Sequence, residues 1–208
     1  MIDQKQQMLD WYNDSLDKYG DSDYRALTWG DAEGRSAAYR YKIIDSIVSL
    51  NDRSVLEVGC GWGSIFDFGF NPKDYLGLDI NKALIEIAQN KYKDKRFINA
   101  ELSNYSSSNK YDVCIASGVA GNRGGPTWHP DLLDSFLDDA LRCAKLVVIN
   151  FPSIWANIRS EHVEYFAPEQ VFAAAVRKNR NVQLHHFENF DFFLTIGKTH
   201  NESINTSA

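Results

Sequence analysis

The segment 57–63, which reads E-V-G-C-G-W-G, is the part of the sequence best suited to bind a ligand. It continues a short apolar stretch that begins at position 54. Glycines allow the backbone to come close to a ligand and to adopt a positive φ without a Cβ clash. Ligands of open α/β sheets bind at the carboxyl ends of the strands, where such a turn would lie. The alternative is a tight glycine turn that binds nothing.

The spacing of these glycines distinguishes two kinds of cofactor site. A dinucleotide site has the pattern G-x-G-x-x-G, which would place the third glycine at position 64. The chain has Ser64 there and its glycines at Gly59, Gly61 and Gly63, with Glu57 two positions before the first. This E-x-G-x-G-x-G pattern is closer to loops that bind S-adenosylmethionine (SAM) than to loops that bind NAD. An NAD-dependent oxidoreductase stays open as an alternative.

Carboxylates follow the next two apolar segments. Asp79 lies near the end of segment 75–80, where a carboxylate can accept hydrogen bonds from both hydroxyls of a ribose. Glu101 follows segment 96–99 and can accept a hydrogen bond from an adenine amino group, while the amide of Leu102 contacts the ring. NAD sites use a ribose-binding acid in the same way, and Asp79 can also cap the helix that follows. These residues therefore support a nucleoside-containing cofactor without separating SAM from NAD.

Three further candidates lie in loops. Ser117 begins a run of small residues at 117–122, after the fourth apolar segment, which would let a second substrate approach the cofactor. His129 and His162 lie in loops that can border a pocket, so each is a candidate general base. A base is needed only where the substrate must lose a proton. The alternative for each histidine is a structural or simply exposed role.

An aromatic segment near the N-terminus has two interpretations. Trp29, together with Tyr24 and Arg25, can form a lid over the cofactor. The same residues can instead pack the N-terminal segment onto the sheet. Both interpretations require residues 1–50 to lie against the rest of the domain.

The candidate residues need a scaffold of alternating strands and helices. Strands are expected at 54–58, 75–80, 96–99, 111–116, 145–150, 182–186 and 190–196. Helices are expected at 2–19, 36–50, 81–92 and 132–143, and Pro168 opens another. Continuous apolar strands that alternate with helices predict a parallel sheet covered on both faces. The last two strands are typical of an antiparallel hairpin at the edge.

Four segments carry a family resemblance. They read VLEVGCGWG, YLGLDIN, FINAEL and KYDVCIASG, and they follow one another between positions 54 and 118. In this order and spacing they resemble the successive motifs of class I SAM-dependent methyltransferases. The resemblance implies an α/β fold with a doubly wound, mostly parallel seven-stranded sheet, helices on both faces and a C-terminal antiparallel hairpin strand. The flanking segments 29–30 and 161–168 resemble a poorly characterised bacterial and viral branch of small methyltransferases.

The resemblance also implies a set of contacts with SAM. Glu57 would lie near the methionine amino group, the three glycines beside the methionine part, Asp79 on the ribose and Glu101 near adenine. The family often has aspartate at the positions of Glu57 and Glu101, so these two contacts can be rearranged. The full set of expected cofactor-binding residues is Glu57, Gly59, Cys60, Gly61, Gly63, Asp79, Ile80, Glu101, Leu102, Ser117 and Trp29.

The charge of the chain bears on the methyl acceptor. The formal net charge is −6, and no run of Lys or Arg marks a nucleic-acid surface. Segment 117–120 reads S-G-V-A, where DNA amino-methyltransferases have a [DNS]-P-P-[YFW] loop. We therefore expect a small-molecule acceptor. A protein or nucleic-acid methyltransferase, or a SAM-binding module without catalytic activity, stays open.

The domain organisation follows from the same patterns. We expect one SAM-dependent methyltransferase domain over 1–198, with an N-terminal helical lid at 1–50 and a disordered polar tail at 199–208. The N-terminus lacks the apolar run of a signal peptide, no segment is apolar enough to span a membrane, and three dispersed cysteines suit a reducing compartment. These features predict a cytoplasmic protein. No cysteine or carboxylate spacing suggests a metal site, and the sequence does not reveal the oligomeric state.

Overall fold

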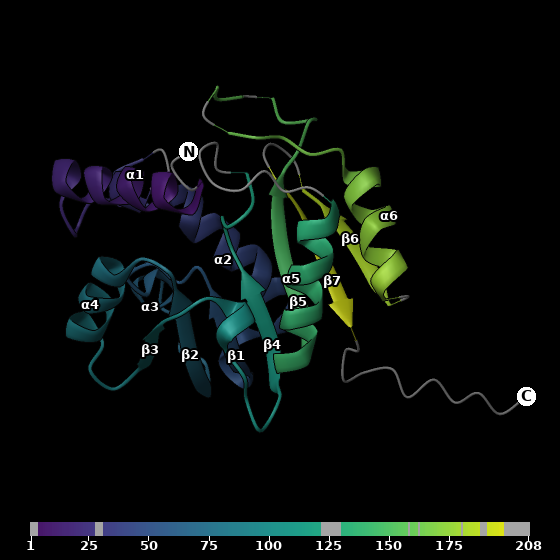
Figure 1. The fold of residues 1–208 in the computed structure, drawn as a ribbon, viewed down its shortest axis with the longest axis horizontal. Helices are drawn as coiled ribbons and strands as arrows, with labels where there is room; N and C mark the ends of the chain where they lie inside the picture. Colours follow the sequence, from purple (N-terminus) through teal and green to yellow (C-terminus); the bar gives the residue numbers. More distant parts are fainter. Residues whose placement is uncertain are drawn as a thin grey trace, which may run out of the picture.

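The computed structural model describes residues 4–27, 31–121, 130–157, 159–161, 163–179, 181–187 and 191–197 (Figure 1). Three of the candidate residues, Trp29, His129 and His162, lie outside the described residues. None of the helices in the described part of the chain is long and apolar enough to cross a membrane.

A seven-stranded sheet forms the centre of the molecule, in the order β3-β2-β1-β4-β5-β7-β6. Its strands are β1 (Ser54–Val58), β2 (Asp74–Asp79), β3 (Arg96–Asn99), β4 (Tyr111–Ala116), β5 (Ala144–Pro152), β6 (Val182–His186) and β7 (Asp191–Gly197). β1 to β5 pair in parallel, and β7 pairs antiparallel with both β5 and β6. The predicted fold class is confirmed. The hairpin also forms, but its antiparallel strand β7 lies inside the sheet and β6 forms the edge.

The strand sequences explain why the sheet is covered on both faces. Successive side chains of a strand point to opposite faces. Along β1, Val55 packs into one hydrophobic layer and Leu56 into the other, and neither side chain is exposed. Burying an aliphatic side chain of this size contributes about 1.5–3 kcal/mol. Because both faces of β1 and β4 are apolar, these strands require helices on each side.

The helices divide between the two faces, as Figure 1 shows. The first layer is made with α2 (Arg35–Val48), α3 (Ser64–Asp67) and α4 (Lys82–Lys91). The second is made with α5 (Pro130–Cys143) and α6 (Pro168–Lys178). The predicted cap of α4 is confirmed, since the Asn81 side chain accepts a hydrogen bond from the Leu84 amide at 3.2 Å. Pro168 begins α6 as predicted.

The first helix, α1 (Gln4–Tyr19), lies across the carboxyl ends of the strands instead of along a face of the sheet. The side-chain amide of Asn81 donates a hydrogen bond to Asn13 of α1, at 3.0 Å. Lys5 pairs with Glu101, which follows β3. A short 3-10 helix, η1 (Tyr24–Leu27), follows α1 and packs into the first layer. The N-terminal segment therefore covers the end of the sheet at which ligands of this architecture bind.

Candidate functional site

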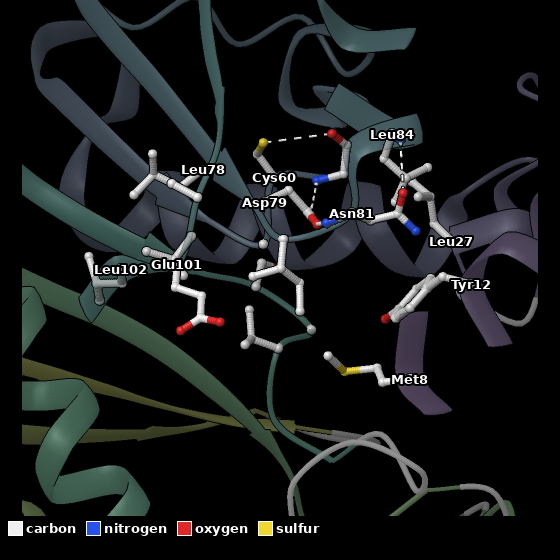
Figure 2. A pocket seen from close by; sticks show the side chains of 18 of the residues that line it. Met8, Tyr12, Leu27, Cys60, Leu78, Asp79, Asn81, Leu84, Glu101 and Leu102 are labelled. Carbon is white, nitrogen blue, oxygen red and sulfur yellow. Dashed lines mark hydrogen bonds between the residues drawn. The ribbon is translucent and has the colours of Figure 1, made fainter. Parts of the chain in front are cut away.

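A cavity of about 250 Å³ opens at the carboxyl ends of β1, β2 and β4, under α1. The chain winds outward from β1 to β3 on one side and from β4 to β5 on the other, so the cavity lies at the switch point of the sheet. Eight of the expected cofactor-binding residues line it: Gly59, Cys60, Gly61, Asp79, Ile80, Glu101, Leu102 and Ser117. Figure 2 shows Asp79 and Glu101 at this cavity, with Met8 and Tyr12 of α1 reaching it from another side.

The glycine loop serves both the cavity and the packing beside it. Gly59 has φ +71°, and a Cβ there would lie 2.7 Å from Cγ2 of Val119, so only glycine allows β1 and the loop after β4 to approach this closely. Gly63 has φ +82°, and a Cβ there would lie 2.9 Å from the Phe97 ring. Gly63 does not line the cavity. Its role in the structure is to let α3 begin against β3.

Asp79 is held in place by the backbone around it. One carboxylate oxygen accepts the Gly61 amide at 2.9 Å and the other accepts the Asn81 amide at 2.8 Å. Burial raises the pKa of Asp79, and these two hydrogen bonds partly offset that effect. Each carboxylate oxygen has further acceptor capacity. Asp79 can therefore accept hydroxyl hydrogen bonds in the cavity while it fixes the glycine loop.

Glu101 lies in a different environment at another side of the cavity. Its carboxylate pairs with Lys5 of α1, and the Lys5 ammonium holds the pKa of Glu101 below its usual range. Both side chains are more than a third exposed. The adjacent Leu102 is buried and gives this side of the cavity an apolar wall. A carboxylate beside an apolar wall can bind a flat ring that carries an amino group.

Glu57 does not line the cavity, in contrast to the expectation from the resemblance. It is only 1% exposed and accepts hydrogen bonds from the Tyr41 hydroxyl at 2.7 Å and the Tyr75 hydroxyl at 2.5 Å. Burial raises the pKa of Glu57 to about 7, although the two hydroxyls act in the opposite direction. Tyr41 does line the cavity. Glu57 is therefore connected to the cavity through Tyr41.

A buried polar chain, which the sequence did not suggest, supports the loop after β4. The Gly118 amide donates to Oδ1 of Asn150 at 2.8 Å, and the Asn150 side chain donates to Asp191 at 2.7 Å. Asp191 pairs in turn with Arg40 of α2. The only sequence signal was that Asn150 and Asp191 are polar residues within strands that are otherwise apolar. This series of polar contacts fixes the position of Gly118, which lines the cavity.

The aromatic segment near the N-terminus packs onto the core in its described part. Tyr24 is buried, donates a 2.6 Å hydrogen bond to Asp67 and packs edge-on against Trp62. Arg25 pairs with Asp23. Neither Tyr24 nor Arg25 lines the cavity, whereas Leu27 at the end of η1 does, together with Met8, Leu9 and Tyr12 of α1.

The cavity has polar groups that suit SAM. Asp79 and Glu101 offer carboxylates for hydroxyl and amino groups, and the glycine loop brings backbone amides to the cavity. Ser117 is 4% exposed and lines the cavity, and its hydroxyl has no hydrogen-bond partner among the described residues. A buried hydroxyl without a partner is costly unless a ligand supplies one. This donor set fits a zwitterionic nucleoside cofactor.

Known proteins support the same conclusion. A family model described as a methyltransferase domain matches residues 55–145. The magnesium protoporphyrin IX methyltransferase of Synechocystis PCC 6803, with bound SAM, superposes with a TM-score of 0.65 at 15% identity, covering 95% of this chain and 99% of that one. DesVI of Streptomyces venezuelae has a TM-score of 0.60 at 13% identity, over 84% and 97%.

A third structure is phosphoethanolamine N-methyltransferase 1 of Haemonchus contortus, in complex with phosphoethanolamine and S-adenosylhomocysteine (SAH). It superposes with a TM-score of 0.63 at 11% identity, over 93% of this chain and 50% of that one. No curated protein matches the sequence. Identities this low establish the fold, and the family match adds the methyltransferase domain itself. Residues 55–145 match the methyltransferase domain, the whole chain has the fold of SAM-dependent methyltransferases, and SAM is the cofactor to which the domain match and the fold point.

Proposed function

We propose that this enzyme transfers the methyl group of SAM to a small-molecule acceptor. The observation that carries the proposal is the cover that α1 places over the cavity. Met8, Leu9 and Tyr12 line the cavity from that helix, opposite the carboxyl ends of the strands. A covered site suits an acceptor that can enter as a whole better than one that belongs to a long polymer.

The residues of the chain have distinct roles in this proposal. When bound, SAM supplies a methyl group already activated by its sulfonium, so the protein has to align the acceptor and exclude water. Asp79 binds the ribose hydroxyls and Glu101 the adenine amino group. Gly59 and Gly61 allow the methionine part to lie close to the backbone. The apolar side chains of α1 keep water away from the reacting atoms.

The acceptor would approach along the loop after β4. Ser117, Gly118 and Val119 all line the cavity and present little bulk there. Because Asn150 holds the Gly118 amide, the start of this loop keeps a fixed position. For an acceptor that must lose a proton, His129 and His162 are the proposed general bases. Single substitution of each histidine, assayed with the identified acceptor, tests this role.

Two further observations favour a small molecule. The net charge of −6 gives no general attraction to nucleic acid. Two of the structural relatives are named as methyltransferases of magnesium protoporphyrin IX and of phosphoethanolamine, both small molecules. A protein or nucleic-acid acceptor is the competing outcome of the experiment below.

The first experiment measures the melting temperature of the purified protein with SAM, SAH, NAD or no ligand. A ligand that binds only the folded state raises the apparent stability. We expect SAM and SAH to raise the melting temperature and NAD to leave it unchanged. Transfer of labelled methyl from SAM is then measured with small amines, acids and phenols, and in parallel with mixed protein and mixed nucleic acid. Transfer confined to the macromolecules would contradict the small-molecule proposal.

A further inference from the structure

Two carboxylates lie below the glycine loop without a basic partner among the described residues. Neither Glu57 nor Asp79 takes part in any ion pair found there. Glu57 is buried, and Asp79 is partly exposed to the cavity. Taking a charge out of water is costly unless an opposite charge compensates it. The site therefore has an excess of negative charge that a cationic ligand can compensate.

The surroundings of Glu57 explain how it carries this charge. Tyr41 faces it from α2, Tyr75 from β2 and the Cys60 thiol from the glycine loop, while β4 places the apolar Ile115 opposite it. Asp79 adds a repulsive negative charge. Within the described part of the chain, every titratable group that faces Glu57 is therefore neutral or acidic. With burial, this raises the pKa of Glu57 to about 7, so the carboxyl group can hold or lose its proton near neutral pH.

We propose that Glu57 is the proton-linked counter-charge of the cofactor site, losing its proton to solvent when SAM binds and thereby favouring SAM over SAH. The proposal rests on the use of SAM described above. Tyr41 both lines the cavity and donates to Glu57, so a single residue connects the carboxylate with the cavity. SAM carries a sulfonium charge that SAH lacks. An added positive charge stabilises the ionised carboxylate.

The proton balance of this step is simple. In the protonated fraction of the free enzyme, the O–H bond of the Glu57 carboxyl group breaks on binding, and its proton passes to the buffer. The resulting carboxylate accepts the hydrogen bonds of Tyr41 and Tyr75 and faces the added positive charge of the ligand. No electron transfer is involved. With SAH the sulfonium charge is absent, so less proton release is expected.

Calorimetric titration in two buffers of different ionisation enthalpy measures the protons released per ligand bound. At pH 7 we expect the wild-type enzyme to release about half a proton per SAM, because a group with a pKa near 7 is half protonated there. SAH should release clearly less. The Kd for SAM should fall about tenfold between pH 6 and pH 8, because only the ionised fraction binds well. Glu57→Gln should lose both effects except for the part that comes from titration of the ligand's own amino group, which the variant measures and which is subtracted from the wild-type values.

Two tyrosine variants make the test independent of how Glu57→Gln folds. Tyr75→Phe removes a hydrogen bond that lowers the pKa of Glu57, so the proton-release profile should move to higher pH. Tyr111→Phe, on β4 and hydrogen-bonded to Arg96, should leave the profile unchanged. Equal proton release by wild type and Glu57→Gln, or an unshifted profile in Tyr75→Phe, would overturn the proposal for Glu57 and leave the proposed function unaffected. A wild-type enzyme that binds no SAM at any pH would overturn the proposed function as well.

Discussion

Two ion pairs connect the N-terminal helices to the ligand-binding end of the sheet, and they differ in burial. Arg40 of α2 pairs with Asp191 at the start of β7, and the two side chains are 18% and 6% exposed. Lys5 of α1 pairs with Glu101, and those side chains are 47% and 38% exposed. A buried pair is costly to break, whereas an exposed pair contributes little. We therefore expect α2 to be a fixed part of the core and α1, which Tyr12, Leu16 and the Asn13 hydrogen bond also hold, to open more easily than α2.

Breaking the buried pair should give the largest effect. Arg40→Ala leaves the Asp191 carboxylate buried without its guanidinium, which should lower the free energy of unfolding by about 3–5 kcal/mol. Urea unfolding followed by circular dichroism measures this loss. Arg35→Ala, at the exposed start of the same helix, is the matched control and should change stability by about 0.5 kcal/mol or less. Similar losses in the two variants would remove the distinction between the pairs.

Glu57 extends the comparison to a buried carboxylate without a basic partner among the described residues. Its pKa of about 7 in the folded state lies above the ordinary value of 4.5. Below pH 4.5 the group is protonated in both states and has no effect on stability. As the pH rises from 4.5 to 7, the unfolded chain ionises first, so the folded state loses on the order of 3 kcal/mol of stability.

Glu57→Gln lacks this pH-dependent loss. The free energy of unfolding of the variant, relative to wild type, should therefore increase between pH 4.5 and pH 7 and stay constant above pH 7. Urea unfolding at pH 4.5, 5.5, 7 and 8 measures the difference. A difference that does not vary with pH would mean that Glu57 is ionised throughout, as Glu101 is expected to be beside Lys5.

Asp79 shares features with both the buried and the exposed carboxylates. Backbone amides hold its side chain in place, yet that side chain is open to the cavity. Asp79→Ala should weaken SAM binding by about 1–3 kcal/mol, since the ribose hydroxyls would lose a buried acceptor. Asp74→Ala, at the exposed start of the same strand, is the control and should leave SAM affinity unchanged. Calorimetric titration of both variants checks the assignment. Unaltered affinity in a folded Asp79→Ala protein would contradict it.

Breaking the exposed pair should give the smallest effect. Lys5→Ala should change the free energy of unfolding by about 1 kcal/mol or less, and added salt should reduce the difference further. Hydrogen exchange of the α1 amides should become faster in this variant, while α2 keeps its protection. If α1 and α2 respond alike, the two helices open together and α1 is not a separate cover.

The elements that the sequence predicted best are those dictated by local pattern. The bounds of β1, β3, β4 and β6 agree with the predicted segments, because each is a short run between clear breaks. The glycine spacing and the position of Asp79 at a strand end predicted the cofactor, because both are also local features of the sequence. By contrast, α3 ends after four residues, and Gly69 with φ +85° soon follows it. The helix that follows the glycine loop is therefore very short.

What could not be predicted depends on residues far apart in the sequence. Glu57 meets Tyr41 because α2 packs on the face of β1 that Glu57 shares with Val55, and it meets Tyr75 because β2 pairs with β1. The position of β7 between β5 and β6 is likewise a tertiary choice, because a hairpin pattern does not say which of its strands joins the sheet. Tertiary contacts of this kind determine whether a carboxylate lines the cavity, as Asp79 does, or lies outside its lining, as Glu57 does.

The interior position of β7 also affects the order in which the molecule can assemble. Arg40 emerges from the ribosome 151 residues before its partner Asp191, and neither β5 nor β6 has its antiparallel neighbour until residues 191–197 are made. Pairings this distant in sequence form slowly. A nascent chain therefore leaves the edge of β5 that pairs with β7 exposed until late in synthesis. During that interval it is open to pairing with other chains and to capture by chaperones.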